Sequence, residues 1–178
     1  MRYGKIKYFD IADGVGVRTA LFVSGCTHRC PGCFNPETWD FNYGEEFTGE
    51  TAEEIIEKSA PPYIAGLTLL GGEPMEPENQ RSLLPFVRTF RERLPGKSVW
   101  CYTGYIYEKD LKKEEGRAHC EVTDELLSLI DILVDGEFDE SLKNLSLHFR
   151  GSENQHVIDL KTGEYLYMDD PGKTLNGS

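Results

Sequence analysis

Short, continuous apolar runs recur along the chain, and each is followed by glycine or by polar residues. Four of them lack the alternation of a half-exposed strand. They therefore predict strands that are buried on both faces of a parallel sheet: residues 20–23 (ALFV), 66–70 (GLTLL), 98–102 (SVWCY) and 132–135 (ILVD). Further along, residues 145–149 alternate and lead into a fifth apolar segment at 157–160.

Helical patterns lie between the predicted strands. Thr51 and Glu54 have the spacing of a capping box and predict a helix that ends near Ala60, before two prolines. A second helix is predicted over about 78–93, where Pro85 either kinks the helix or marks a late start. Its buried stripe consists of five apolar residues at helical spacing: Leu83, Leu84, Val87, Phe90 and Leu94.

The last third of the chain is less regular. Residues 108–121 are charged and without periodicity, which predicts an exposed excursion, and Thr123 is expected to cap a short helix. From about residue 161 the chain is polar, and we expect this tail to fray. No internal repeat or linker divides the sequence, so we expect a single domain over residues 1–178.

Alternating strands and helices predict an α/β fold with a parallel sheet. A complete (β/α)8 barrel takes roughly 250 residues, more than the 178 of this chain. We therefore expect a partial, open parallel β/α barrel of about five or six βα units. Such a barrel has an open side that can admit a loop of another protein.

Composition excludes several classes of function. The net charge is −12, which argues against nucleic-acid binding. No apolar stretch reaches the 18 residues of a membrane span, and the N-terminus lacks the apolar core of a signal peptide, so no membrane partner is expected. The chain has five cysteines, and an odd number of them does not suggest a disulfide framework. A reducing cytoplasm is the expected location.

Three cysteines carry the clearest chemical signal. Cys26, Cys30 and Cys33 stand at Cx3Cx2C spacing directly after the first apolar run. Closely spaced thiolates hold iron–sulfur clusters, and three ligands leave one iron of a four-iron cubane open for a substrate. A structural zinc site is the alternative, with His28, Cys101 or Cys120 as fourth ligand. Zinc motifs usually contain two ligand pairs, and the sequence has no second pair.

A glycine pair follows the second predicted strand. Gly71 and Gly72 let a ligand approach the backbone, and Glu73 offers an acceptor to an ammonium group. On its own, GGEP is also an ordinary turn before a helix. Residues 13–18 (DGVGVR) are a weaker signal of the same kind, because two glycines at this spacing are typical of a turn into a strand.

Together these motifs resemble the radical S-adenosylmethionine superfamily. The resemblance implies a [4Fe-4S] cluster on Cys26, Cys30 and Cys33, with S-adenosylmethionine chelating the open iron and the GGE segment holding its amino group. Most of that superfamily has an aromatic residue before the last cysteine, where this chain has Gly32. That departure is similar to the anaerobic ribonucleoside-triphosphate reductase activating proteins. So are the segments DGVGVR, YTGY and DGEF, at residues 13–18, 102–105 and 135–138.

The resemblance implies a function and a set of site residues. The cluster cleaves S-adenosylmethionine reductively, and the 5′-deoxyadenosyl radical takes a hydrogen atom from a glycine of the reductase, which leaves a glycyl radical. Cys26, Cys30 and Cys33 are then the catalytic and metal-binding residues. The cofactor contacts are Gly32, Cys33, Phe34, Gly71, Gly72 and Glu73. Phe34 either packs on the adenine or is an ordinary core phenylalanine.

The resemblance also implies partners: the glycyl-radical subunit of the reductase and an electron donor such as flavodoxin. The choice between a monomer and a homodimer stays open. Three other functions remain: activation of another glycyl-radical enzyme such as pyruvate formate-lyase, radical chemistry on a small molecule, and a zinc or iron–sulfur binding module without catalysis. His148 and His156 are read as half-buried strand histidines in preference to catalytic ones.

Overall fold

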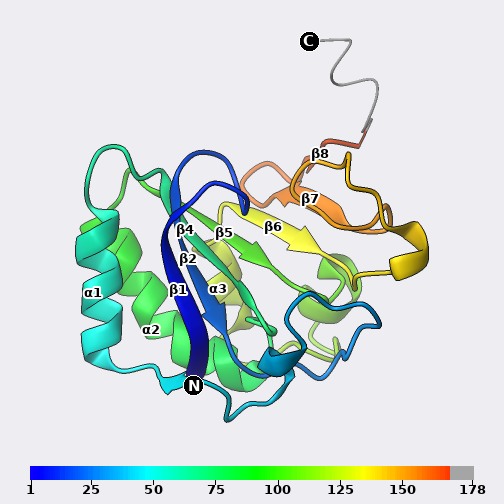
Figure 1. Cartoon of the computed structure of the whole chain (residues 1–178), viewed down its shortest axis with the longest axis horizontal. Helices are drawn as coiled ribbons and strands as arrows, with labels where there is room; N and C mark the ends of the chain where they lie inside the picture. The colour runs from blue at the N-terminus through cyan, green and yellow to red at the C-terminus, as the bar shows by residue number, and fades with distance from the viewer. Residues whose placement is uncertain (169–178) are drawn as a thin grey trace.

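An eight-stranded mixed sheet organises residues 1–168, which are the residues that the computed structural model describes. The strands cross the molecule side by side, from β1 at one side to β7 and β8 at the other (Figure 1). In spatial order they are β3 (Glu45–Glu46), β1 (Arg2–Asp10), β2 (Arg18–Val23), β4 (Gly66–Gly71), β5 (Ser98–Tyr102), β6 (Ile132–Asp135), β7 (His156–Asp159) and β8 (Tyr165–Leu166).

The four central strands are the four that the apolar runs predicted, and their parallel pairing is confirmed. β2 pairs with β4, β4 with β5 and β5 with β6, all parallel. The strands are joined by helices α1 (Gly49–Ser59), α2 (Pro77–Arg93) and α3 (Thr123–Ser128). The prediction of five or six βα units is wrong for the described residues, which contain three such crossovers. After β6 the chain turns back, and β7 returns antiparallel, with Val134 opposite Val157.

The sheet is extended beyond its parallel centre by antiparallel strands that the sequence did not predict. β1 pairs antiparallel with β2, and Lys5 and Lys7 stand opposite Phe22 and Ala20. β8 pairs antiparallel with β7, so the expected fraying does not begin at residue 161. The remainder of the expected tail, residues 169–178, lies outside the described residues. The alternating segment 145–149 forms turns and not a strand.

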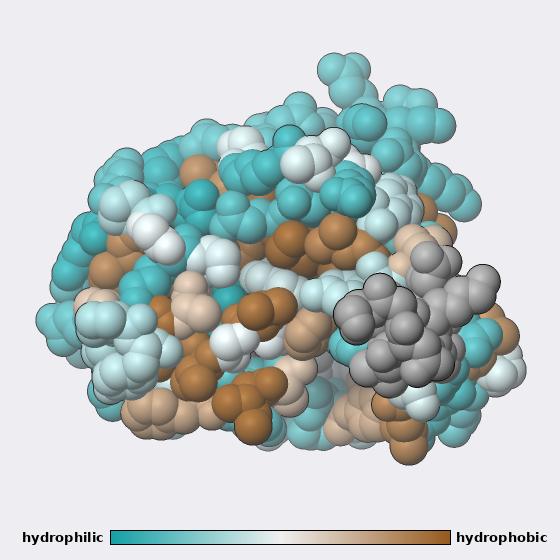
Figure 2. Space-filling view, turned by 90° about the horizontal axis from the view of Figure 1, so that it is seen from above, coloured by the Kyte–Doolittle hydropathy of each residue, from teal (hydrophilic) through white to brown (hydrophobic). Residues whose placement is uncertain are grey.

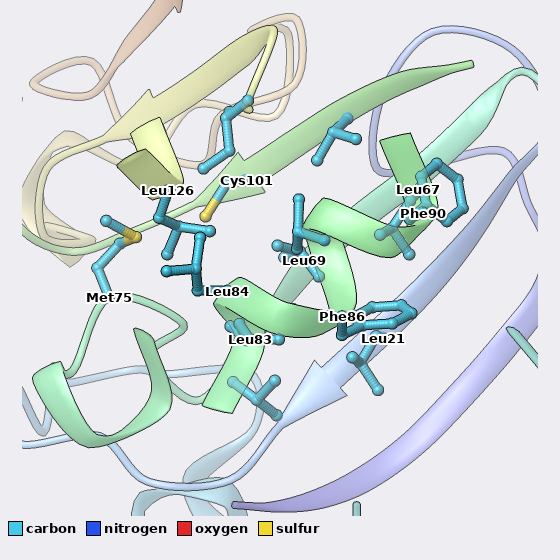
Figure 3. Packing of buried hydrophobic residues seen from close by; sticks show 14 of the residues in the cluster. Leu21, Leu67, Leu69, Met75, Leu83, Leu84, Phe86, Phe90, Cys101 and Leu126 are labelled. Carbon is cyan, nitrogen blue, oxygen red and sulfur yellow. The ribbon is translucent and has the colours of Figure 1, made fainter. Parts of the chain in front are cut away.

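The main hydrophobic core lies between one face of the sheet and the helices. Side chains of α2 face residues of β2, β4 and β5 across this layer (Figure 3). Each of the central strands contributes alternate residues to it, among them Leu21, Leu67, Leu69, Val99 and Leu133. Cys101 belongs to the same core and is fully buried.

Two helix starts differ from those predicted. α1 begins with a capping box of Thr48 and Thr51, whose hydroxyl oxygens each accept the other's backbone N–H at 3.2 Å. The motif at Thr51–Glu54 fits the same pattern, but the chain uses the earlier one. α3 begins at Thr123, which is not its N-cap. Its hydroxyl instead accepts the backbone N–H of Cys120 at 2.8 Å and donates to Gln80.

Two further expectations about the helical regions are corrected. α2 runs unbroken through Pro85, so a late start is wrong. Pro85 lies at an exposed position of this helix. Residues 108–121 are not wholly exposed: Asp110 and Leu111, in a π-helical turn, and Ala118 are buried. The Asp110 carboxylate accepts the Ile106 N–H at 2.8 Å, and this bond offsets its burial.

The opposite face of the sheet carries two small apolar clusters and the site. Ala20, Phe22 and Leu70 form one cluster, and Trp100 with Val134 and Val157 forms the other.

Figure 2 views the end of the molecule where the β1–β2 and α1–β4 loops lie in Figure 1, and brown residues gather in its middle. No helix within residues 1–168 is long and apolar enough to cross a membrane.

Candidate functional site

The loop that carries Cys26, Cys30 and Cys33, the cysteine loop, follows β2 at its carboxyl end. Gly25 makes the turn with φ 103°, a conformation that favours glycine. A Cβ atom there would overlap the ring of Phe41. The backbone N–H groups of Gly25 and Cys26 donate to the carbonyl oxygens of Thr38 and Trp39 at 2.7 and 3.2 Å. The 36–39 turn therefore fixes where the loop starts.

The GGEP loop lies directly beside it, at the carboxyl end of β4. The Gly72 N–H donates to the Val23 carbonyl at 2.9 Å, and the Glu73 N–H donates to the Gly25 carbonyl at 2.8 Å. A Cβ atom on Gly71, whose φ is 126°, would come within 2.5 Å of the Val23 backbone. Glycine is therefore required for the two loops to approach this closely.

The two loops wall one cavity of about 500 Å³, which extends over the open face of the sheet. Seven of the predicted site residues line it: Cys26, Cys30, Cys33, Phe34, Gly71, Gly72 and Glu73. Gly32 is not part of the lining. It adopts φ 77°, and a Cβ atom there would lie 2.9 Å from the carboxylate of Glu140. The sequence thus correctly predicted which segments meet, although they are 37 or more residues apart.

The three thiols line one cavity, but they are not arranged around a single ion. Within residues 1–168 no three His, Cys, Asp or Glu side chains are arranged to hold one metal ion. Ligands of one ion converge on one atom, whereas three thiolates of a cubane each bind a different iron. Two of the suggested zinc ligands lie elsewhere, because Cys101 is in the core and Cys120 contacts Gln80 at 3.5 Å.

Burial favours the protonated form of two of the thiols, Cys26 and Cys30. Burial raises the pKa of Cys26 to about 12. Burial also raises the pKa of Cys30, and the negative charge of Glu137 adds to this effect. Iron binding would therefore displace protons from these thiols, as metal binding to cysteine does generally. The donor set, three thiols beside one cavity, suits an iron–sulfur cluster in its chemistry.

The Glu73 carboxylate has other partners than those expected. Its exposed fraction is 0%. Oε1 accepts the Met75 N–H at 2.8 Å, and Oε2 accepts the Gly104 N–H at 2.6 Å. Oε2 also lies 2.8 Å from Nε2 of His28. Three donors from three different segments therefore surround the group that was predicted to accept an ammonium.

His28 bridges two carboxylates. Its Nε2 meets Glu73, and its Nδ1 lies 2.8 Å from Oε1 of Glu137. Carboxylates accept hydrogen bonds, so this arrangement favours the imidazolium form, in which both ring nitrogens donate. Burial lowers the pKa of His28, but the hydrogen bonds and charges of Glu73 and Glu137 outweigh it, and the net shift is upward. The sequence suggested His28 only as a zinc ligand and missed this bridge.

Phe34 and the two late histidines are also placed by the structure. Phe34 is 68% exposed, so its interpretation as a core residue is wrong. Its ring contacts that of Phe138 at a centroid distance of 5.5 Å, at the edge of the cavity. His156 is a half-buried residue of β7, as predicted, and its Nδ1 lies 2.9 Å from Asp135. His148 lies in a turn outside any strand.

Comparison with known proteins agrees with this geometry. A family model described as a 4Fe-4S single cluster domain matches residues 12–158. Anaerobic ribonucleoside-triphosphate reductase-activating proteins of Salmonella typhimurium and Escherichia coli are each 41% identical over 163 residues, which is 90% of this chain and 100% of theirs. The Haemophilus influenzae protein of the same name is 40% identical over 88% of this chain and 97% of its own. The chain therefore belongs to the family of anaerobic ribonucleoside-triphosphate reductase-activating proteins.

Proposed function

We propose that the protein activates an anaerobic ribonucleoside-triphosphate reductase by generating its glycyl radical. The single observation that carries this proposal is the shared cavity, which brings three thiols and the Gly71–Glu73 loop together in a chain of this family. In the proposal Cys26, Cys30 and Cys33 hold a [4Fe-4S] cluster. With S-adenosylmethionine bound in the same cavity, the two cofactors would supply the electron transfer and hydrogen abstraction that form the radical.

The chain's own residues bind and orient these cofactors. Gly71 and Gly72 present backbone without side chains to the cavity, so the methionine part of S-adenosylmethionine can lie against them. Gly32 and Cys33 form the adjacent turn, in which the Cys33 N–H donates to the Cys30 carbonyl at 3.1 Å. The exposed ring of Phe34 is free to cover an adenine. We assign this set to a radical S-adenosylmethionine domain whose open face receives the glycine-bearing segment of the reductase.

The proposal extends to location and partners. All five cysteines are free thiols, which fits the reducing cytoplasm. We propose a flavodoxin-like protein as electron donor. Activation of a different glycyl-radical enzyme, such as pyruvate formate-lyase, is the second candidate, because the same cavity would serve it. The experiments below distinguish these two functions from each other and from that of a metal-binding module without catalysis.

The first test is metal content. Protein reconstituted anaerobically should hold about four irons per chain, the number in one cubane. Changing Cys26, Cys30 or Cys33 to Ala should abolish the cluster absorbance. Cys120→Ala is the matched control and should retain it, because that thiol lies outside the cavity. Stoichiometric zinc without iron uptake would overturn the cluster assignment.

The second test is the radical. The reconstituted protein, S-adenosylmethionine, a reductant and the reductase should together give a doublet in electron paramagnetic resonance, because one α-hydrogen remains on the radical glycine. Reductase with that glycine dideuterated should transfer deuterium to 5′-deoxyadenosine. A doublet that forms only with pyruvate formate-lyase would show that the proposed partner is wrong. If no glycyl-radical enzyme gives a signal, the activating function is refuted.

A further inference from the structure

Two carboxylates of the segment between β4 and α2, Glu73 and Glu76, bind the middle of the cysteine loop. Glu76 accepts the Thr27 N–H at 2.8 Å and the Thr27 hydroxyl at 2.7 Å, both through Oε1. Oε2 of Glu73 lies 2.8 Å from Nε2 of the next residue, His28, and forms a hydrogen bond with it. Thr27 and His28 lie between the first two cysteines of the motif. Both residues between Cys26 and Arg29 are therefore fixed by charged acceptors.

The contact of Glu76 is not the one that its local position favours. Glu76 is the N-cap residue of α2, yet its side chain makes no capping hydrogen bond to that helix. Its exposed fraction is 6%, and a buried carboxylate needs strong donors to offset desolvation. It finds them on Thr27, 49 residues earlier in the chain. Its carboxylate therefore faces the cysteine loop and Tyr105 instead of its own helix.

The Glu73–His28 contact joins further loops. Gly104, at the end of β5, donates its N–H to Glu73 at 2.6 Å. A Cβ atom on Gly104 would come within 2.7 Å of the His28 ring, so this glycine makes room for the imidazole. His28 in turn reaches Glu137, which follows β6. The loops after β2, β4, β5 and β6 therefore meet at one histidine.

Backbone strain follows the two clamped residues directly. Arg29 adopts φ 52°, in the left-handed region that non-glycine residues rarely occupy. Such a conformation persists where its surroundings hold it. Thr27 and His28 are held on one side of Arg29, and on the other the Cys33 N–H donates to the Cys30 carbonyl at 3.1 Å.

We infer that Glu73 and Glu76 are positioning residues that clamp Thr27 and His28, and thereby turn the three thiols toward one cavity before metal is bound. The use of this arrangement for an iron–sulfur cluster rests on the proposed function, whereas the clamp itself does not.

Trypsin cleavage after Arg29 in the metal-free full chain tests the clamp directly. Glu76→Ala removes the acceptor of two charge-assisted hydrogen bonds, so cleavage there should become at least about tenfold faster. Glu76→Gln keeps an acceptor but loses its charge and should give a smaller increase, which provides the measurement if the alanine variant does not fold. Glu78→Ala, at an exposed position of the same helix, is the control and should cleave like the wild type. Unchanged cleavage in both Glu76 variants would overturn the inference.

The two roles of Glu73 predict different results. As a positioning residue, Glu73→Gln should speed cleavage after Arg29 without any cofactor and change the electron paramagnetic resonance spectrum of the reduced cluster. As an amino-group acceptor alone, it should weaken S-adenosylmethionine binding and leave both readouts at the wild-type value, which would refute the positioning role. A chain that takes up only zinc but shows faster cleavage would retain the clamp and lose the proposed function.

Discussion

Arg18 is a buried residue whose replacement should lower the stability of the fold by a predictable amount. It is 1% exposed, and its guanidinium makes five hydrogen bonds of 2.8–3.0 Å. The acceptors belong to the 13–17 loop, to β4 and to β5, and none is a carboxylate: Val15 O, Leu67 O, Thr68 Oγ1, Ser98 O and Ser98 Oγ. Burial lowers the pKa of Arg18 to about 10, so it remains charged at neutral pH.

The magnitude for Arg18→Lys follows from counting donors. A lysine ammonium has three N–H groups at one atom, so at least two of the five bonds are lost. At about 1.5 kcal/mol for each bond to a charged group, the free energy of unfolding should fall by about 3 kcal/mol. Arg18→Met should lose all five bonds but also avoids burying a charge, which offsets part of the loss.

Urea unfolding of the metal-free protein measures this difference, because metal release would add a second transition. Arg81→Lys is the matched control. Its ion pair with Glu121 is about half exposed, so a change below about 1 kcal/mol is expected. If the free energy of unfolding of Arg18→Lys lies within about 1 kcal/mol of the wild-type value, the five hydrogen bonds do not contribute together as argued and the reasoning fails.

Two other substitutions test local conformation and charge. Gly25→Ala should destabilise the protein by about 2 kcal/mol, because φ is positive there and the added Cβ meets Phe41. Thermal unfolding measures this loss. Gly49→Ala is the control and should not lower the unfolding midpoint, because no atom lies within 4 Å of the added Cβ. Burial and neighbouring Asp10 raise the pKa of Asp13 to about 7, so the folded state binds this proton more tightly than the unfolded state and stability should fall as pH rises from about 4 to about 7. Asp13→Asn should reduce that fall in urea midpoints measured at pH 5 and pH 8, and an unchanged fall would contradict the assignment.

The central sheet was predictable because its strands are buried on both faces. All six residues of β2 are buried, and nothing in such a run competes with the strand interpretation. β1 was not predicted, although lysines alternate with apolar residues over 5–8 as they do in a half-exposed strand. The predicted number of βα units was too high. Chain length sets an upper limit on this number, but it does not show where the chain reverses after β6.

The meeting of the cysteines with the GGEP loop was predictable from topology. Both segments follow parallel strands, and the carboxyl ends of neighbouring parallel strands lie at the same edge of a sheet. What could not be predicted is the direction of each polar side chain. Glu73 offers the same carboxylate to a cofactor or to a histidine, and only the packed loops decide between them. His28 and Thr27 gave no periodic or motif signal beyond their place between cysteines.

A net charge of −12 suggests a solvated acidic surface, yet several acids at this edge of the sheet are buried and structural. Glu73 and Glu76 accept backbone N–H groups of other loops, and Asp135 accepts that of Tyr107 at 2.8 Å. Burial raises the pKa of Cys26, and the charges of Glu73 and Glu76 add to this effect. The buried acids that order the loop therefore also favour the protonated form of the Cys26 thiol when no metal is bound.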